Sequence, residues 1–231
     1  MTSTHSEDLD RLWSGARRYS RLLSPVPDRI SAALGRLYTF YLDSEKKRDI
    51  EVPEACYSAV AQIEKTASLK LPLYFAAATL YPNKFKTAED NTERALLSAL
   101  EPGLFSVFTA LIYYYKRINT LTTHPGWEQL AKDYLLNMEI GFLLGSTVPG
   151  LGAADGTLIG GIRFAALGAM MLKDPSTFDQ VYNSGNVLDW RTEQEAFGTD
   201  HRFVTAQLMQ IAGLHSATDE IQRALCADTP K

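Results

Sequence analysis

A histidine and two carboxylates lie close together near the end of the sequence, in a combination that can hold a metal ion. Glu193, Asp200 and His201 belong to one short stretch. Imidazole and carboxylate groups both bind divalent metals, and a metal-bound water can attack a phosphoester. The stretch also predicts a loop that closes onto a helix, with His201 and Val204 on the apolar face of that helix. These side chains therefore either bind a metal ion or stabilise the fold.

The residue types around this stretch favour the structural role. We interpret His201 as a partly buried histidine that hydrogen-bonds to a neighbouring helix. A metal ligand is the alternative, but no second histidine is placed to help it. Thr199 and Asp200 are expected at the helix start, with their oxygens facing its free amides. Glu193 and Glu195 either brace the loop or are solvated.

The elements that position these side chains are predicted to be helices. Apolar residues recur at helical spacing along most of the chain, and almost no segment alternates strictly as a strand does. The first apolar stripe is Leu9, Leu12, Ala16, Tyr19 and Leu23. Pro102–Gly103 and Asp174–Pro175 are expected to end helices. Since no long polar linker divides the chain, we predict an all-α fold: one multi-helix domain with N-terminal and C-terminal helical lobes.

Four central segments have distinctive patterns. Leu69–Tyr81 is apolar on most sides and predicts a short buried helix. Trp127–Leu144 predicts a long amphipathic helix, Gly145–Gly156 a connector, and Thr157–Leu172 a helix of small apolar residues. The adjacent Gly160–Gly161 is costly in a helix and indicates close approach of another helix.

Composition excludes several classes of function. The 231 residues are 45% hydrophobic and 22% charged, as in soluble globular proteins, and the net charge of −4 does not attract nucleic acid or acidic lipid. The N-terminal residues do not form a secretion signal, and the longest uncharged stretch, Ile140–Ala154, is too short to span a membrane. Cys56 and Cys226 match no metal or redox spacing. We expect a cytoplasmic protein without nucleic-acid or membrane partners.

These segments, in this order, resemble an HDOD domain, the bacterial relative of the HD metal-dependent phosphohydrolase superfamily. The resemblance rests on Trp127 at the start of a long helix, the small-residue segment Leu158–Gly168, the Asp174–Pro175 turn, and Glu-x-x-x-Phe-Gly-x-Asp-His ending at His201. It covers about residues 20–215. Residues 1–19 are then an N-terminal helical extension, and residues 216–231 a C-terminal helix and tail.

The resemblance implies that the metal ligands are lost. In HD hydrolases, a histidine on one helix, an adjacent His-Asp pair on the next and a later aspartate bind the metals. Those first positions correspond here to Gln129 and to Arg163–Phe164. An amide is a poor metal ligand, arginine repels a cation and phenylalanine has no ligand atom. We therefore expect neither metal nor cofactor, with Glu193, Asp200 and His201 as remnants of the site or as structural residues.

Arg163 is a charged residue in an otherwise apolar segment, so it needs a partner or contact with water. One interpretation is that it reaches the surface or pairs with Asp155, Glu193 or Asp200. The other is that its fixed charge replaces the metal ion, where it holds an anion or locks the lobes together.

The function implied by the resemblance is regulatory. We expect a non-enzymatic bacterial signal-transduction domain that acts through contacts with other signalling proteins or by sensing a small molecule or nucleotide. The aromatic segment around Tyr113 is a candidate contact surface. The alternatives are a divergent HD-type phosphohydrolase of a nucleotide or cyclic dinucleotide, and a nucleotide sensor without turnover.

Overall fold

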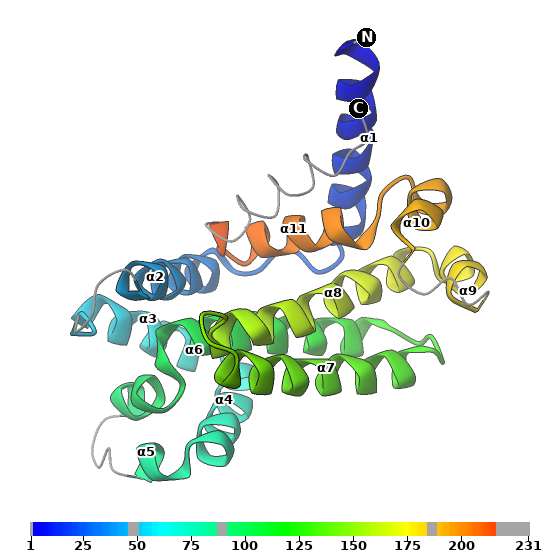
Figure 1. The fold of residues 1–231 in the computed structure, drawn as a ribbon. Helices are drawn as coiled ribbons and strands as arrows, with labels where there is room; N and C mark the ends of the chain where they lie inside the picture. The colour runs from blue at the N-terminus through cyan, green and yellow to red at the C-terminus, as the bar shows by residue number, and fades with distance from the viewer. Residues whose placement is uncertain (1, 46–50, 87–91, 184–188, 216–231) are drawn as a thin grey trace.

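The computed structural model describes residues 2–45, 51–86, 92–183 and 189–215, and all regular structure in these residues is α-helical (Figure 1). The prediction of an all-α fold is confirmed. The helices are α1 (Thr2–Ser20), α2 (Asp28–Glu45), α3 (Glu54–Glu64), α4 (Ala67–Leu80), α5 (Pro82–Lys86), α6 (Thr92–Leu121), α7 (Trp127–Thr147), α8 (Ala153–Lys173), α9 (Pro175–Asn183), α10 (Trp190–Phe197) and α11 (His201–Ile211).

Helix α8 is the centre of the fold. Helices α6 and α7 pack along it from one side, and α11 packs against it from the other (Figure 1). Helices α2 to α5 gather around α6, while α9 and α10 lie near the end of α8. Helix α1 packs against α11, and its first turns project from the body of the molecule. The buried apolar side chains of the described residues form one continuous core from Leu12 to Leu214.

The predicted helix breaks are confirmed. Helix α6 is kinked at Glu101, whose φ is +58°, immediately before Pro102–Gly103. Pro102 has no N–H to continue the helical hydrogen bonds. A Cβ at Gly103 would lie 2.4 Å from the Tyr41 ring, so only glycine allows this close packing. Asp174–Pro175 separates α8 from α9 as expected.

Helix α4 was predicted to be buried, and this is only partly right. Leu69, Leu73 and Ala77 are buried, but Leu71 and Phe75 are 77% and 73% exposed. The segment is apolar on most sides because it carries a core face and an exposed apolar face.

Pro72 lies inside α4, where it cannot donate a hydrogen bond to the carbonyl of Ser68 four residues earlier. The Nζ of Lys116, on α6, donates to this carbonyl instead. The interior proline is therefore tolerated because another helix satisfies the carbonyl that it leaves free.

Helices α7 and α8 are packed backbone to backbone through glycines. A Cβ on Gly141 would lie 2.1 Å from the carbonyl oxygen of Gly156, and one on Gly160 would lie 2.1 Å from that of Asn137. This confirms the close approach expected from Gly160–Gly161. The connector is shorter than predicted, because α7 continues to Thr147 and α8 begins at Ala153.

Two helices, α6 from Glu93 and α8, are long and apolar enough to cross a membrane by length and composition alone. However, 78% and 72% of their most apolar stretches are buried inside the protein. Such burial is typical of core helices in a water-soluble protein, which agrees with the expectation from composition.

The aromatic segment around Tyr113 lies partly in the core, where the half-buried Tyr113 donates to the Pro25 carbonyl at 2.8 Å, and its role as a contact surface stays a prediction. Tyr114 is fully buried and donates to the Leu208 carbonyl, while Tyr115 packs against Trp127 and Tyr134. The predicted last helix and Cys226 lie outside the described residues.

Candidate functional site

The turn between α10 and α11 carries the candidate site. Helix α10 starts at the N-cap Asp189 and ends at Phe197, followed by Gly198 with φ of +70°. Glycine adopts this left-handed conformation without strain and reverses the chain there. Asp200 then has extended backbone and caps α11, because its Oδ1 accepts from the backbone N–H of Arg202 at 2.8 Å. The predicted cap at Asp200 is confirmed.

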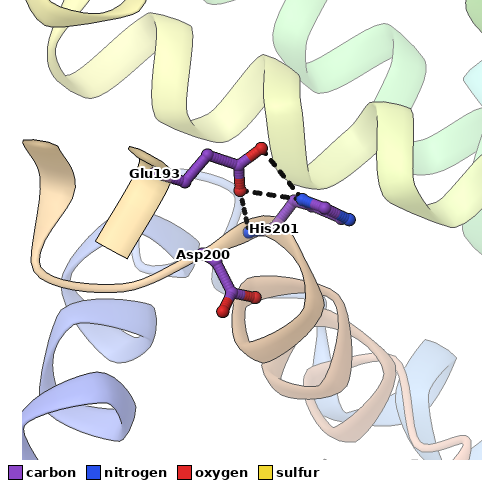
Figure 2. Close-up of side chains that lie close together, drawn as sticks. All are labelled: Glu193, Asp200 and His201. Carbon is purple, nitrogen blue, oxygen red and sulfur yellow. Dashed lines mark hydrogen bonds and ion pairs between the residues drawn. The ribbon is translucent and has the colours of Figure 1, made fainter. Parts of the chain in front are cut away.

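Glu193 joins the two helices through His201. Its carboxylate is fully buried, and Oε2 accepts from the backbone N–H of His201 at 2.7 Å. The same oxygen lies 2.7 Å from the His201 Nδ1, and Oε1 lies 3.0 Å from it (Figure 2). Beside a carboxylate acceptor, this nitrogen carries the ring proton. Of the two interpretations for Glu193, the structure supports the brace, whereas Glu195 is exposed to solvent.

The Glu193 carboxylate has a third donor, the hydroxyl of Tyr182 on α9, which lies 2.8 Å from Oε1. Burial, and then the neighbouring carboxylate, raise the pKa of Tyr182, so this hydroxyl keeps its proton and remains a donor. Three helices thus meet at one buried carboxylate.

The Asp200 carboxylate is also buried, and it points away from that of Glu193 (Figure 2). The Arg202 side chain binds both of its oxygens, with Nε 3.1 Å from Oδ1 and a terminal nitrogen 3.0 Å from Oδ2. Gln194 donates to Oδ2 at 2.6 Å. The Arg202 guanidinium also lies 4.5 Å from the centre of the Trp190 ring. Charge and hydrogen bonds of Asp200 are therefore satisfied within the protein.

The turn is held against α1. The buried hydroxyl of Thr199 donates to the Leu12 carbonyl at 2.8 Å, and a terminal nitrogen of Arg18 donates to the Phe197 carbonyl at 3.1 Å. Thr199 was expected to face the amides of α11, and that expectation is wrong. Its hydroxyl binds a carbonyl of α1 because α1 lies directly across the turn, where a Cβ on Gly15 would meet the Thr199 Cβ at 2.8 Å.

The donor set at this turn does not fit a metal ion. One potential ligand atom from each of Glu193, Asp200 and His201 falls within 4.8 Å of the others. However, a cation at Asp200 would have to displace the guanidinium of Arg202. At Glu193 it would have to displace donors from Tyr182 and His201. A divalent ion would gain few ligands and break a buried network, so the arrangement is structural.

The resemblance predicted lost metal-ligand positions at Gln129, Arg163 and Phe164. Gln129 is exposed on the first turns of α7 and donates to Asp133. Phe164 is buried on α8, and its ring lies 6.4 Å from that of Tyr134. Both are ordinary structural positions.

Arg163 on α8 does not have the carboxylate partner that was predicted. The candidate Asp155 accepts from Tyr38 and Tyr41, and the other two candidates are engaged as described above. Within the described part of the chain, the Arg163 Nε is buried without a hydrogen-bond partner, and the guanidinium stacks 4.9 Å from the centre of the Phe164 ring. The prediction of an ion pair fails because all three carboxylates have nearer donors.

Sequence reasoning missed Tyr182, Gln194 and Arg202. Arg202 carried a local signal, since it follows the N-cap Asp200 by two residues and its side chain can fold back onto the cap. Tyr182 carried none, because only the packing of α9 brings its hydroxyl to Glu193.

An open surface hollow of about 570 Å³ lies at the turn between α6 and α7. Tyr115 and Trp127 form its aromatic part, and His124 and Lys132 contribute polar groups. His124 is held by Asp179 at 3.2 Å. The hollow is a shallow depression with groups that could contact a small ligand.

No family model matches this chain, and neither a curated protein nor a solved structure is significantly similar to it.

Proposed function

We propose that this chain is a non-enzymatic regulatory domain of bacterial signal transduction, similar to an HDOD domain. The observation that carries the proposal is that the buried carboxylates of Glu193 and Asp200 are satisfied by donors within the protein. Glu193 accepts from Tyr182 and His201, and Asp200 accepts from Gln194 and Arg202, so the two carboxylates hold three helices together. A metal ion at either carboxylate would have to displace these donors.

The exposed apolar side chains support action through protein contacts. Leu71 and Phe75 form one exposed apolar pair on α4, and α7 carries a larger group. Exposed apolar patches on soluble proteins mark interaction sites. We propose other signalling proteins as partners in the cytoplasm. A small molecule or nucleotide in the hollow beside Trp127 would be a second input.

The first test is metal content and phosphoesterase activity of the purified protein. We expect well below one transition-metal ion per chain, and no hydrolysis of nucleotides or cyclic dinucleotides when Mn²⁺ is added. A stoichiometric metal, with turnover that disappears in Asp200→Ala but not in Glu195→Ala, would overturn the proposal in favour of a divergent phosphohydrolase. Glu195→Ala is the matched control because its side chain is exposed and it lies on α10, close to the turn in sequence.

Thermal unfolding across a panel of nucleotides tests the sensing mode. A ligand at 100 times its Kd adds about 2.7 kcal/mol by mass action, which raises the Tm by about 5–10 °C for a domain of this size. The shift should be lost in Trp127→Ala relative to the unliganded variant. A shift that persists in this variant would contradict the hollow as the ligand site.

A further inference from the structure

Helix α4 carries the two most exposed large apolar side chains among the described residues. Leu71 is 77% exposed and Phe75 is 73% exposed. Because they are four residues apart, they lie on the same side of the helix, one turn from each other. The buried residues Leu69, Leu73 and Ala77 lie on the other side. We call Leu71 and Phe75 the α4 pair.

The α4 pair protrudes from the surface. Neither of the hollows described for this chain, one beside Trp127 and one along α2, is lined by a residue of α4. Helices α4 and α5 lie at one edge of the molecule, away from α1, α9 and α10 (Figure 1). The pair is therefore placed to meet a broad surface.

Lysines surround the α4 pair. With 3.6 residues per turn, Lys70 lies on one flank of the pair and Ser68 on the other. The Nζ of Lys116 donates to the Ser68 carbonyl, so α6 places a cation on this second flank. Lys65 is exposed and immediately precedes the start of α4. Cations thus border the pair on both flanks and at the beginning of the helix.

The charge near the α4 pair is positive, although the net charge of the chain is −4. From Lys65 to Lys86 the sequence has four lysines and no acidic residue. Glu64, which comes before this stretch, accepts from the Tyr74 hydroxyl at 2.6 Å. Glu89 and Asp90, which follow it, lie outside the described residues. The expectation that the chain is not attracted to acidic lipid followed from its net charge, and that average does not reveal a local surplus of lysine.

Three of these lysines have neutral contacts. Lys65 donates to a side-chain amide, the Nζ of Lys70 lies 5.4 Å from the centre of an aromatic ring, and Lys116 donates to the carbonyl described above. Lys84, by contrast, forms an ion pair with Glu101 at 3.4 Å. The positive charges of the first three lysines are therefore suited to anionic groups outside the protein.

We propose that the α4 pair docks on the surface of an anionic lipid membrane. Leu71 and Phe75 insert at the boundary between headgroups and acyl chains, and the three lysines with neutral contacts face the lipid phosphates. A helix face with large apolar side chains and flanking lysines favours this interface, and binding grows with the buried apolar area and with attraction to anionic lipid. Helix α4 does not cross the membrane, because its other side belongs to the core.

A lipid surface fits the α4 pair better than a partner protein does. Two protruding side chains need a matching apolar pocket on a protein, whereas the boundary of a bilayer adapts to them and presents phosphates on every side. The exposed apolar group on α7 does not share this chemistry. Glu128 and Glu139 are exposed on the same helix and would be repelled by anionic lipid, so the α7 group remains for protein contacts.

The number of groups involved sets the strength expected. Two inserted side chains supply less apolar area than one myristoyl chain, which alone gives only marginal binding. Each lysine near an anionic surface contributes about fivefold in affinity. Because the Debye length falls from about 10 Å at 0.1 M salt to about 3 Å at 1 M, we expect weak, reversible binding that decreases with salt.

Vesicle flotation with the whole chain tests the proposal. One set of vesicles is phosphatidylcholine alone, and the other contains about 30% phosphatidylglycerol. We expect binding to the second set in about 50 mM NaCl, at least tenfold weaker binding in about 500 mM NaCl, and little binding to the first set.

Substitutions separate insertion from general attraction. Leu71→Ser and Phe75→Ser should each weaken binding about tenfold or more, the factor that corresponds to burial of one large apolar side chain. Lys70→Gln should weaken it about fivefold in low salt. The urea midpoint should change little, because all three side chains are exposed. Ile159→Ser, a 65% exposed apolar position on α8, is the matched control and should bind like the wild type.

Two results would overturn the proposal. The first is a wild-type chain that does not float with phosphatidylglycerol vesicles in low salt, which would leave the α4 pair to an acidic protein partner. The second is binding that Leu71→Ser and Phe75→Ser leave unchanged, or that Ile159→Ser weakens equally.

An environment-sensitive label reports the insertion directly. In a Cys226→Ser background, where Cys56 is buried, Phe75→Cys is labelled with a nitrobenzoxadiazole dye. Its emission should shift to the blue when vesicles with phosphatidylglycerol are added, because the dye enters an apolar environment. The same dye at Ile159→Cys should not shift. A shift at Ile159→Cys alone would overturn the assignment to α4.

This inference goes beyond the proposed function and does not rest on it. The two fail separately, since vesicle binding is measured without a metal or a substrate, and the metal and turnover assays contain no lipid.

Discussion

At the scale of single residues, Glu193 is the most constrained group in the site. A buried carboxylate loses its hydration, and the loss is tolerable only when hydrogen bonds replace it. Here two donors of His201 and the hydroxyl of Tyr182 supply them. Two of these donors lie at the start of α11 and the third lies on α9. The carboxylate therefore fixes both the cap of α11 and the position of α9.

Replacement of Glu193 tests this role. Glu193→Gln should lower the free energy of unfolding by about 2–3 kcal/mol, because the amide NH₂ cannot accept from the donors that Glu193 Oε1 and Oε2 now share. Urea denaturation measures the loss. Glu195→Gln, two residues away and exposed, should change it by less than about 0.5 kcal/mol. Equal stability of Glu193→Gln and the wild type would show that the network does not support the fold.

At the scale of elements, the α7–α8 pair depends on the absence of side chains. Glycine costs about 1 kcal/mol in a helix relative to alanine, yet several glycines recur at this contact. They allow the two backbones to touch, so α8 lies in the centre of the bundle while α7 presents its other side to solvent.

Gly141→Ala tests whether the gain in helix propensity or the steric clash with α8 is larger. Alanine gains about 1 kcal/mol of helix propensity, but its Cβ would lie 2.1 Å from the backbone of α8, which cannot move away as a side chain can. We expect a net loss of about 2–3 kcal/mol, typical of overpacking against a fixed neighbour. Chemical denaturation measures it. Ser146→Ala, exposed on the same helix, should be nearly neutral; a stabilised Gly141→Ala would contradict the close contact.

At the scale of the whole molecule, α1 belongs to the core although its first turns project from the body. Leu12, Ala16 and Tyr19 are buried, and the Trp13 ring contacts the Phe203 ring of α11 edge-on at 4.9 Å. The division into an extension at 1–19 and a domain from 20 stays a prediction about sequence relationship. It does not mark a boundary in packing.

Truncation tests whether α1 is part of the packed domain or an extension attached to it. A chain that begins at Ser20 should lose about 5 kcal/mol or more, comparable with the whole stability of many domains, because the removed side chains leave α11 uncovered. Thermal unfolding by circular dichroism should then show no cooperative transition above room temperature. A chain that begins at Leu9 retains the buried residues and should unfold within a few degrees of the full chain. Similar unfolding of both truncations would show that α1 is an independent appendage.

The sequence by itself determined most of the helices, the kink before Pro102, the start of α7 at Trp127 and the cap at Asp200. These features depend on residues within one or two helical turns, so local spacing and capping chemistry suffice to predict them. Tertiary structure decided which groups meet. Three features depend on how helices distant in sequence pack: the partner of Glu193 on α9, the unbonded Nε of Arg163 among the described residues, and the exposed apolar side chains of α7. An apolar residue type indicates only a preference for burial; whether other parts of the chain cover that residue depends on how the helices pack.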